Sequence, residues 1–111
     1  MRNMSFALTT QQFINKSKTV TRRFGWKFLK KGDLICGVEK AMGLQKGEKI
    51  KRLGVIRIIS NDVVRLDSIT QDDVIKEGFP NWKPADFINL ITKHYNVKSD
   101  SMINRIEFEY V

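Results

Sequence analysis

Eight consecutive residues near the start of the chain concentrate groups that bind anions. The segment Lys16–Arg23 has the sequence KSKTVTRR and carries four cations and three hydroxyls. Hydroxyls bind phosphate oxygens directionally, arginine offers a planar fork for two hydrogen bonds, and lysine supplies a point charge. If the segment is extended, Lys18, Val20 and Arg22 point to one side and the residues between them to the other. A solvated run of charge has a similar composition, so both interpretations stay open.

The carboxylate of Glu77 is a second candidate for chemistry. It precedes Gly78 and Phe79, at the expected end of a short helix. A carboxylate there can be aimed into a cleft and serve as a general acid or base. The simpler alternative is a helix-end glutamate that pairs with a nearby lysine.

Four aromatic residues lie nearest these polar segments in the sequence: Phe24, Trp26, Phe79 and Trp82. An aromatic side chain that stacks on a nucleic-acid base typically contributes about 1 to 3 kcal/mol. Core packing is the default role of such residues, but Trp26 and Trp82 are candidates for a stacking surface.

The sequence offers few residues for metal or redox chemistry. Cys36 is the only cysteine and His94 the only histidine. No disulfide can form within the chain, and neither a cysteine cluster nor a histidine pair is available to hold a metal. We expect Cys36 to be a buried thiol and His94 a surface residue at a helix end, with no metal and no cofactor.

The positive charge is concentrated in the first half of the chain. The net charge is +8, yet residues 1–32 contain eight basic residues and no acidic one. Residues 1–52 contain 13 basic and three acidic residues, whereas residues 53–111 contain seven basic and nine acidic ones. Phosphates respond to summed potential and to counterion release, so this asymmetry predicts a surface that faces a polyanion. A basic protein without such a partner is the alternative.

Size and hydropathy predict one domain over residues 1–111 with one core, since 111 residues and 41% hydrophobic content suit a single compact unit. No apolar run approaches the roughly 20 residues that cross a bilayer, and residues 1–10 lack the apolar stretch of a secretory signal. We therefore expect a cytoplasmic protein with no membrane partner.

Periodicity and turn residues predict the elements that position these groups. In the first half we expect a strand at 4–8, a helix from Thr9 or Thr10 to Lys16 with Phe13 and Ile14 inward, a strand at 34–40, and an exposed segment at 41–51. In the second half we expect a hairpin of strands 53–59 and 63–66 turning at Asn61-Asp62, a helix capped by Thr70 and ended by Gly78, a helix at 84–95, and a strand at 103–110.

In their order, several of these segments resemble the ASCH domain family, small relatives of the PUA-like β-barrels of RNA-modification proteins. The resemblance covers nearly the whole chain. It rests on KTVTRR at 18–23, KGD at 31–33, MGLQKG at 42–47, ITQDDV at 69–74, EGFP at 77–80, and a late helix that contains Phe87.

The resemblance implies an α+β fold, a small PUA-like, mostly antiparallel β-barrel decorated with short helices. It also implies that the KTVTRR segment and the Glu77 region line one cleft that binds RNA or a nucleotide. Some members are similar to amidohydrolases that deacylate N4-acetylated cytidine. Their scheme makes Thr21 the nucleophile, Lys18 its base or an oxyanion donor, and Glu77 a proton carrier. Other members resemble ribonucleases.

The chain departs from the amidohydrolase branch, which lacks the 42–51 excursion and the EGFPNWKP segment. We therefore predict RNA or nucleotide binding, with a hydrolase as the alternative, and leave both catalysis and oligomeric state open. The predicted catalytic residues are Lys18, Thr21 and Glu77. The predicted nucleic-acid-binding residues are Lys16, Lys18, Thr19, Thr21, Arg22, Arg23, Trp26, Lys46, Lys49, Lys51 and Trp82.

Overall fold

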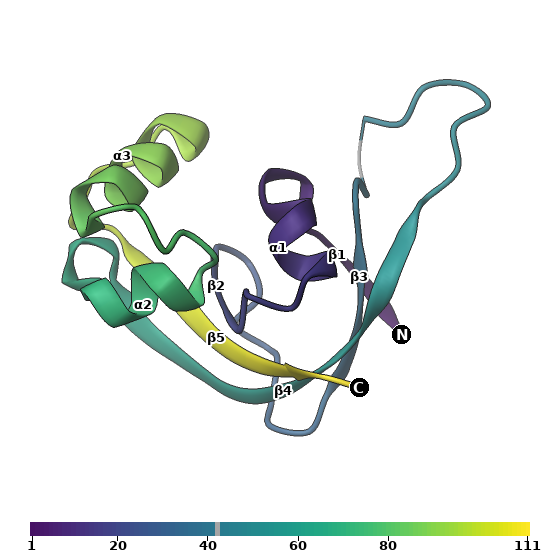
Figure 1. The fold of residues 1–111 in the computed structure, drawn as a ribbon, viewed down its shortest axis with the longest axis horizontal. Helices are drawn as coiled ribbons and strands as arrows, with labels where there is room; N and C mark the ends of the chain where they lie inside the picture. Colours follow the sequence, from purple (N-terminus) through teal and green to yellow (C-terminus); the bar gives the residue numbers. More distant parts are fainter. Residues whose placement is uncertain (42) are drawn as a thin grey trace.

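The computed structural model describes residues 1–41 and 43–111, so Met42 of the predicted 42–47 motif lies outside the described residues. Figure 1 shows the elements in chain order. The strands are β1 (Arg2–Ser5), β2 (Val20–Arg23), β3 (Leu34–Val38), β4 (Arg52–Arg65) and β5 (Met102–Tyr110). The helices are α1 (Thr10–Ile14), α2 (Gln71–Lys76) and α3 (Pro84–Tyr95), with short 3-10 turns at Ala7–Thr9 and Leu66–Ser68.

The five strands form one mixed sheet that curls into a half-barrel. The strand order is β1-β3-β4-β5-β2, and only the β1–β3 pairing is parallel. In Figure 1, β4 and β5 sweep under the molecule as a curved floor with the helices above them. The predicted α+β fold with a mostly antiparallel, PUA-like barrel is confirmed, with β1 and β2 as its two open edges.

The buried apolar side chains form two clusters, where the sequence predicted one core. The first cluster contains Phe6, Phe13 and Phe108 and lies around α1 and β1. The second contains Phe87 and Ile91 and lies under α2 and α3. The long strands β4 and β5 contribute residues to both clusters, because one end of each strand lies in the first cluster and the other end in the second.

The predicted hairpin at Asn61-Asp62 is wrong, because β4 runs as one 14-residue strand from Arg52 to Arg65. The Asn61 amide donates to the carbonyls of Trp26 and Leu29, each at 3.0 Å, and its oxygen accepts a bond from Asn104 at 3.0 Å. Those bonds tie Asn61 across the sheet. The chain bends at a register shift between Ile58 and Ser60 instead of reversing.

The N-terminal elements are shorter than predicted. β1 ends at Ser5, and the helix ends at Ile14 and not at Lys16, whose φ of 63° lies in the left-handed region. Phe13 is buried as expected, but Ile14 is 50% exposed because the five-residue helix presents only a narrow inner face. The described part of the 41–51 segment contains no helix or strand and is largely exposed, as predicted.

The elements that position Glu77 match the prediction closely. Thr70 caps α2, since its hydroxyl accepts a 3.2 Å bond from the Asp73 amide. Gly78 then ends the helix with φ of 103°. The following helix α3 spans the predicted residues and buries Phe87 and Ile91.

In the described residues we find no helix that is both long enough and apolar enough to span a membrane.

Candidate functional site

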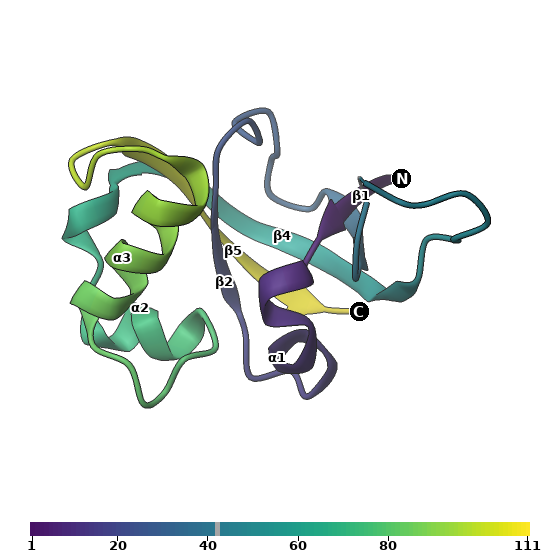
Figure 2. The same ribbon diagram turned by 90° about the horizontal axis from the view of Figure 1, so that it is seen from above.

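A cleft of about 910 Å³ opens between the two hydrophobic clusters. Its walls come from both edge strands β1 and β2, from the end of α2, and from one side of α3. Figure 2 shows β2 passing between α3 and α1, so β2 side chains can reach the space from the sheet floor. The three predicted catalytic residues, Lys18, Thr21 and Glu77, all line this cleft.

Lys18 and Glu77, far apart in the sequence, form a buried ion pair. Their residues are 3% and 1% exposed. The Lys18 ammonium donates to Glu77 Oε1 at 2.8 Å and to the Glu77 carbonyl at 2.9 Å. Burial lowers the pKa of Lys18, and the charge and hydrogen bond of Glu77 oppose that shift.

Main-chain bonds hold both ends of this pair. The Lys18 carbonyl accepts a 2.6 Å bond from the Tyr110 hydroxyl, and the Lys18 amide donates to the Gln12 carbonyl at 3.2 Å. The Thr19 amide donates to the Lys76 carbonyl at 2.8 Å, which ties the start of β2 to the last turn of α2. The segment before β2 is therefore fastened directly to the helix end that carries Glu77.

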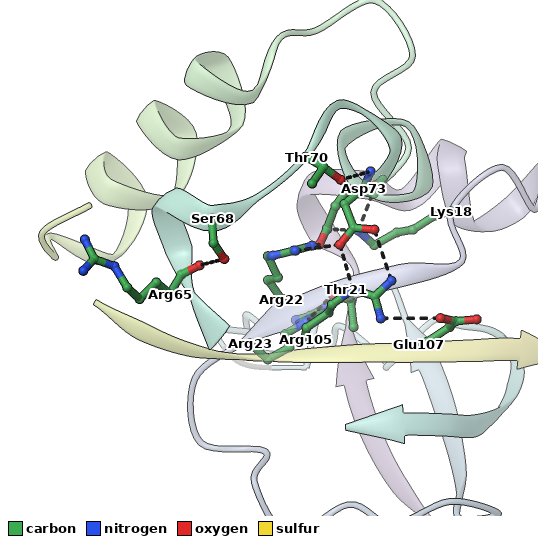
Figure 3. Close-up of polar contacts among 11 residues, drawn as sticks. Lys18, Thr21, Arg22, Arg23, Arg65, Ser68, Thr70, Asp73, Arg105 and Glu107 are labelled. Carbon is green, nitrogen blue, oxygen red and sulfur yellow. Dashed lines mark hydrogen bonds and ion pairs between the residues drawn. The ribbon is translucent and has the colours of Figure 1, made fainter. Parts of the chain in front are cut away.

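Arg22 extends the pair into a chain of charges. Its Nη1 lies 3.1 Å from Glu77 Oε2, and its Nη2 lies 2.7 Å from Asp73 Oδ2. Figure 3 shows Arg105 approaching Asp73 from β5 and Glu107 beyond it. Arg105 donates to Asp73 at 2.7 and 3.1 Å and reaches Glu107 at 3.4 Å. The bonds from Arg105, followed by those from Arg22, hold the pKa of Asp73 at about 2.

Arg23 differs from its neighbours because it lines the cleft without an acidic partner among the described residues. Its Nε donates to Thr21 Oγ1 at 2.9 Å, and its guanidinium carbon lies 4.7 Å from the centre of the Phe6 ring. Arg22 points to α2 and Arg23 to Phe6, which confirms the predicted alternation of side chains along this strand.

Thr21, the predicted nucleophile, makes one side-chain hydrogen bond among the described residues. The residue is 2% exposed, and its hydroxyl accepts the Arg23 bond. In the described part of the chain no hydrogen bond links Thr21 to the Lys18 ammonium, whose two hydrogen bonds both go to Glu77. A threonine nucleophile and a lysine base therefore share the cleft without direct contact.

Aromatic side chains cover much of the cleft wall. Phe6 and Trp26 come from the side of the first cluster, and Phe79, Phe87 and Tyr95 from the side of the second. Trp26, a predicted stacking residue, is half-buried and lines the cleft.

Trp82, the other predicted stacking residue, lies outside this cleft. Its ring stacks on Phe79 with centroids 4.1 Å apart and an interplanar angle of 13°. It instead lines a shallow groove on α3 with Asp86, Asn89 and His94. Any contact of Trp82 with a ligand stays a prediction.

Five other predicted binding residues also lie outside the cleft wall. Lys16 is exposed, with its ammonium 6.0 Å from the Tyr110 ring centre, and Thr19 is half-buried. The remaining three, Lys46, Lys49 and Lys51, are exposed. They belong to the segment that projects from the ends of β3 and β4, on the side away from α2 and α3 (Figures 1 and 2).

Sequence reasoning missed several residues that the structure brings to the site. Arg2, Phe6, Lys40 and Tyr95 line the cleft but lie in other segments of the sequence. The sequence places Arg105 only on an alternating strand, yet it pairs with Arg22 in the β2–β5 register. For Asp73 the sequence predicts only a place in the first turn of a helix. Its spacing of four residues from Glu77 could have indicated that both carboxylates lie on the same side of that helix.

The described residues contain no group of three or more histidine, cysteine, aspartate or glutamate side chains suited to a metal ion. What the cleft offers is hydrogen-bond donors, cationic charge and aromatic surface.

Two solved structures share this fold. One is the ASCH domain from Lactobacillus crispatus JV V101, with a TM-score of 0.73 and 11% identity over 98% of this chain and 78% of that one. The other is a protein from Enterococcus faecalis V583 of the family DUF984, with a TM-score of 0.69 and 14% identity over 99% of this chain and 75% of that one. No family model matches the sequence, and no curated protein matches it.

Proposed function

Starting from the ASCH-domain fold of this chain, we propose that its cleft binds RNA or a nucleotide. The observation that carries the proposal is the composition of the cleft wall. Five cationic side chains and one carboxylate, Glu77, line it among the described residues, together with five phenylalanine, tyrosine and tryptophan rings. The cations are Arg2, Lys18, Arg22, Arg23 and Lys40.

The size of the cleft supports a ligand of nucleotide dimensions. Small-molecule sites commonly occupy about 300 to 1,000 Å³, and this cleft measures about 910 Å³. Single-stranded nucleic acids are recognised by aromatic side chains that stack on unpaired bases and by cations that follow the phosphates. Trp26 and Tyr95 offer aromatic surface that is not fully buried.

The distribution of charge within the cleft supports the same ligand class. The only acidic side chain of the described wall is already engaged by Lys18 and Arg22. The exposed cations Arg2 and Lys40 and the partner-free Arg23 are therefore available to phosphates. A ligand without an anionic group would leave the cationic part of this wall unused, and a ligand without a ring would leave the aromatic part unused.

A binding titration at several salt concentrations tests the proposal. We expect fluorescently labelled single-stranded RNA to bind with an affinity that falls as salt rises. In the double variant Arg2→Gln with Lys40→Gln, the slope of log affinity against log salt should shrink by about 0.7 for each phosphate that the protein no longer neutralises. The double variant Lys31→Gln with Lys98→Gln removes the same charge from residues outside the cleft wall. Its slope of log affinity against log salt should therefore decrease less than that of the cleft variant. Absence of RNA and nucleotide binding at low salt rejects the proposal.

A hydrolase is the second candidate, favoured by the presence of Lys18, Thr21 and Glu77 in one cleft. In an amidohydrolase acting on N4-acylated cytidine, the Thr21 oxygen would attack the acyl carbon, and the amine of cytidine would leave with a proton. Water would then cleave the threonine ester and release the acid. Burial shifts the pKa of Lys18 downward, the direction that a proton acceptor requires, although the ion pair with Glu77 opposes the shift. Ribonuclease activity on RNA bound in the same cleft is the other form of this candidate.

The hydrolase candidate is tested by assaying acylcytidine and RNA turnover. Thr21→Ala and Glu77→Gln should each abolish turnover. Ser17→Ala removes a nearby exposed hydroxyl that does not line the cleft and should leave turnover intact. Turnover that survives both cleft substitutions unchanged discards the assignment.

A further inference from the structure

Arg23 combines a cleft position with a lack of acidic partners. Its Nε bond to Thr21 uses one of the five N–H groups of the guanidinium. The guanidinium carbon lies over the Phe6 ring, 4.7 Å from the ring centroid. Among the described residues neither terminal nitrogen has a hydrogen bond or an ion pair. The outer fork of Arg23, defined here as Nη1 and Nη2, is therefore free to bind two oxygens at once.

The partial burial of Arg23 makes an unpaired guanidinium destabilising for the protein. The residue keeps some exposed surface, but burial lowers the pKa of its guanidinium, and only the charges of Tyr95 and Glu77 oppose that shift. A cation that has lost water and gained no counterion is destabilising unless an anion binds beside it. Arginine is the side chain best suited to a phosphate here, because its planar fork matches two phosphate oxygens.

The adjacent residues add further unused donors. Arg22 also lines the cleft and is 4% exposed, and its Nε is buried with no hydrogen-bond partner in the described structure. A buried donor without a partner destabilises the fold by roughly the free energy of the hydrogen bond to water that it has lost. Thr21 uses its oxygen as an acceptor for Arg23 and keeps its own O–H available. Thr21 and Arg23 are in contact and present their free donors together, whereas Arg22 points to α2 and its two terminal nitrogens are already bonded to Glu77 and Asp73.

We infer that Thr21 and Arg23 form a phosphate site in the cleft, with the outer fork of Arg23 as its main contact. The inference rests on the proposed nucleotide-binding function and narrows it: the cleft recognises a nucleotide by its phosphate, and a nucleoside alone is a poor ligand. A phosphate placed there leaves the aromatic wall for the base.

The affinities of the four ribonucleosides are to be compared with those of their 5′- and 3′-monophosphates by NMR titration of the whole chain. A charge-assisted pair of hydrogen bonds should make at least one monophosphate about tenfold to a hundredfold tighter than its nucleoside. In Arg23→Gln this ratio should fall to near one while nucleoside affinity is retained. Arg23→Lys keeps the charge but loses the planar fork, so it should give an intermediate ratio. It replaces Arg23→Gln as the test variant if Arg23→Gln does not fold.

The matched control is Arg57→Gln, because Arg57 is an exposed arginine that pairs with Glu109 away from the cleft. It should keep the ratio of the unmodified protein. An unchanged ratio in both Arg23 variants overturns the phosphate site, as does equal binding of nucleosides and monophosphates by the unmodified protein.

A third ligand separates failure of this inference from failure of the proposed function. If neither nucleosides nor monophosphates bind, nucleotide recognition is rejected, and inorganic phosphate is then titrated alone. Shifts of the Thr21 and Arg23 amide signals that disappear in Arg23→Gln retain a phosphate site for another phosphorylated compound. Absence of those shifts removes the phosphate site as well.

Discussion

At the scale of single residues, the site consists of linked charges more than of separate functional groups. Glu77 accepts bonds from Lys18 and Arg22, and Arg22 also bonds to Asp73, which Arg105 holds from the next strand. A buried charge is tolerated only when it is paired and hydrogen-bonded. Asp73 and Arg105 are therefore positioning residues, since they fix Arg22 and through it the direction of Glu77.

The linked charges predict a pH-dependent effect of Asp73→Asn. The pKa of Asp73 is about 2, below its ordinary value of 3.8, so its ionised form stabilises the fold fully above about pH 4 and loses that effect as the pH falls through 2. We expect Asp73→Asn to lower the free energy of unfolding by about 1 to 2 kcal/mol at pH 7, allowing for solvent screening. Urea unfolding at pH 7 and at pH 2 measures the difference.

Asp72→Asn is the control, because Asp72 lies in the same first turn of α2 and is exposed. It should change stability little at either pH. A destabilisation by Asp73→Asn that is as large at pH 2 as at pH 7 would contradict the role given to the ionised carboxylate.

At the scale of elements, the end of α2 decides where Glu77 lies. Thr70 starts the helix and Gly78 ends it, so the six-residue helix places Asp73 and Glu77 one turn apart on the side that faces β2. The Thr19 amide bond to the Lys76 carbonyl fixes the same helix end to the chain before β2. The geometry of the ion pair thus depends on a helix whose two ends are both set by local residues.

We predict that Gly78→Ala destabilises the protein more than Gly25→Ala. Both glycines have positive φ, 103° and 81°, and each alanine carries the associated backbone cost of about 1 kcal/mol. At Gly78 a Cβ would also lie 2.7 Å from Gln12 Cγ and 2.8 Å from Gln12 Cβ, whereas nothing lies within 4 Å at Gly25. Overpacking should add about 1 to 2 kcal/mol at Gly78, measurable by urea unfolding. Equal losses at the two positions would show that the contact with Gln12 is not restrictive.

The sequence was informative where local rules govern structure. The cap at Thr70, the stop at Gly78 and the helix at 84–95 follow from capping, glycine conformation and apolar spacing, and all three are confirmed. The hairpin at Asn61-Asp62 failed because the amide of Asn61 bonds to loop carbonyls and to Asn104, partners that no local rule reveals.

Long-range pairing also limited what could be predicted of the site. The KTVTRR segment and Glu77 were expected in one cleft through a family resemblance, and the structure brings Lys18 and Glu77 into contact. Arg105 could not be found in this way, because its place beside Asp73 follows from the register of β2 on β5. The binding and catalytic roles of these residues remain predictions.

At the scale of the whole molecule, the half-barrel creates the cleft by not closing. The edge strands β1 and β2 stand at opposite ends of the strand order, and residues of both line the cleft. The two hydrophobic clusters support its two sides and are joined by β4 and β5. Charged residues line the cleft between the two clusters. A single continuous hydrophobic core would leave no space for them there.

The central claim is that this cleft is the place where RNA or a nucleotide binds. It is tested most directly by mapping amide chemical shifts of the isotopically labelled chain during titration with short single-stranded RNA. We predict that the largest shifts fall on β2, on the residues around Glu77 and on the cleft side of α3. Binding that leaves these segments unshifted and perturbs only the exposed 43–51 segment or the outer surface of the sheet would contradict the account.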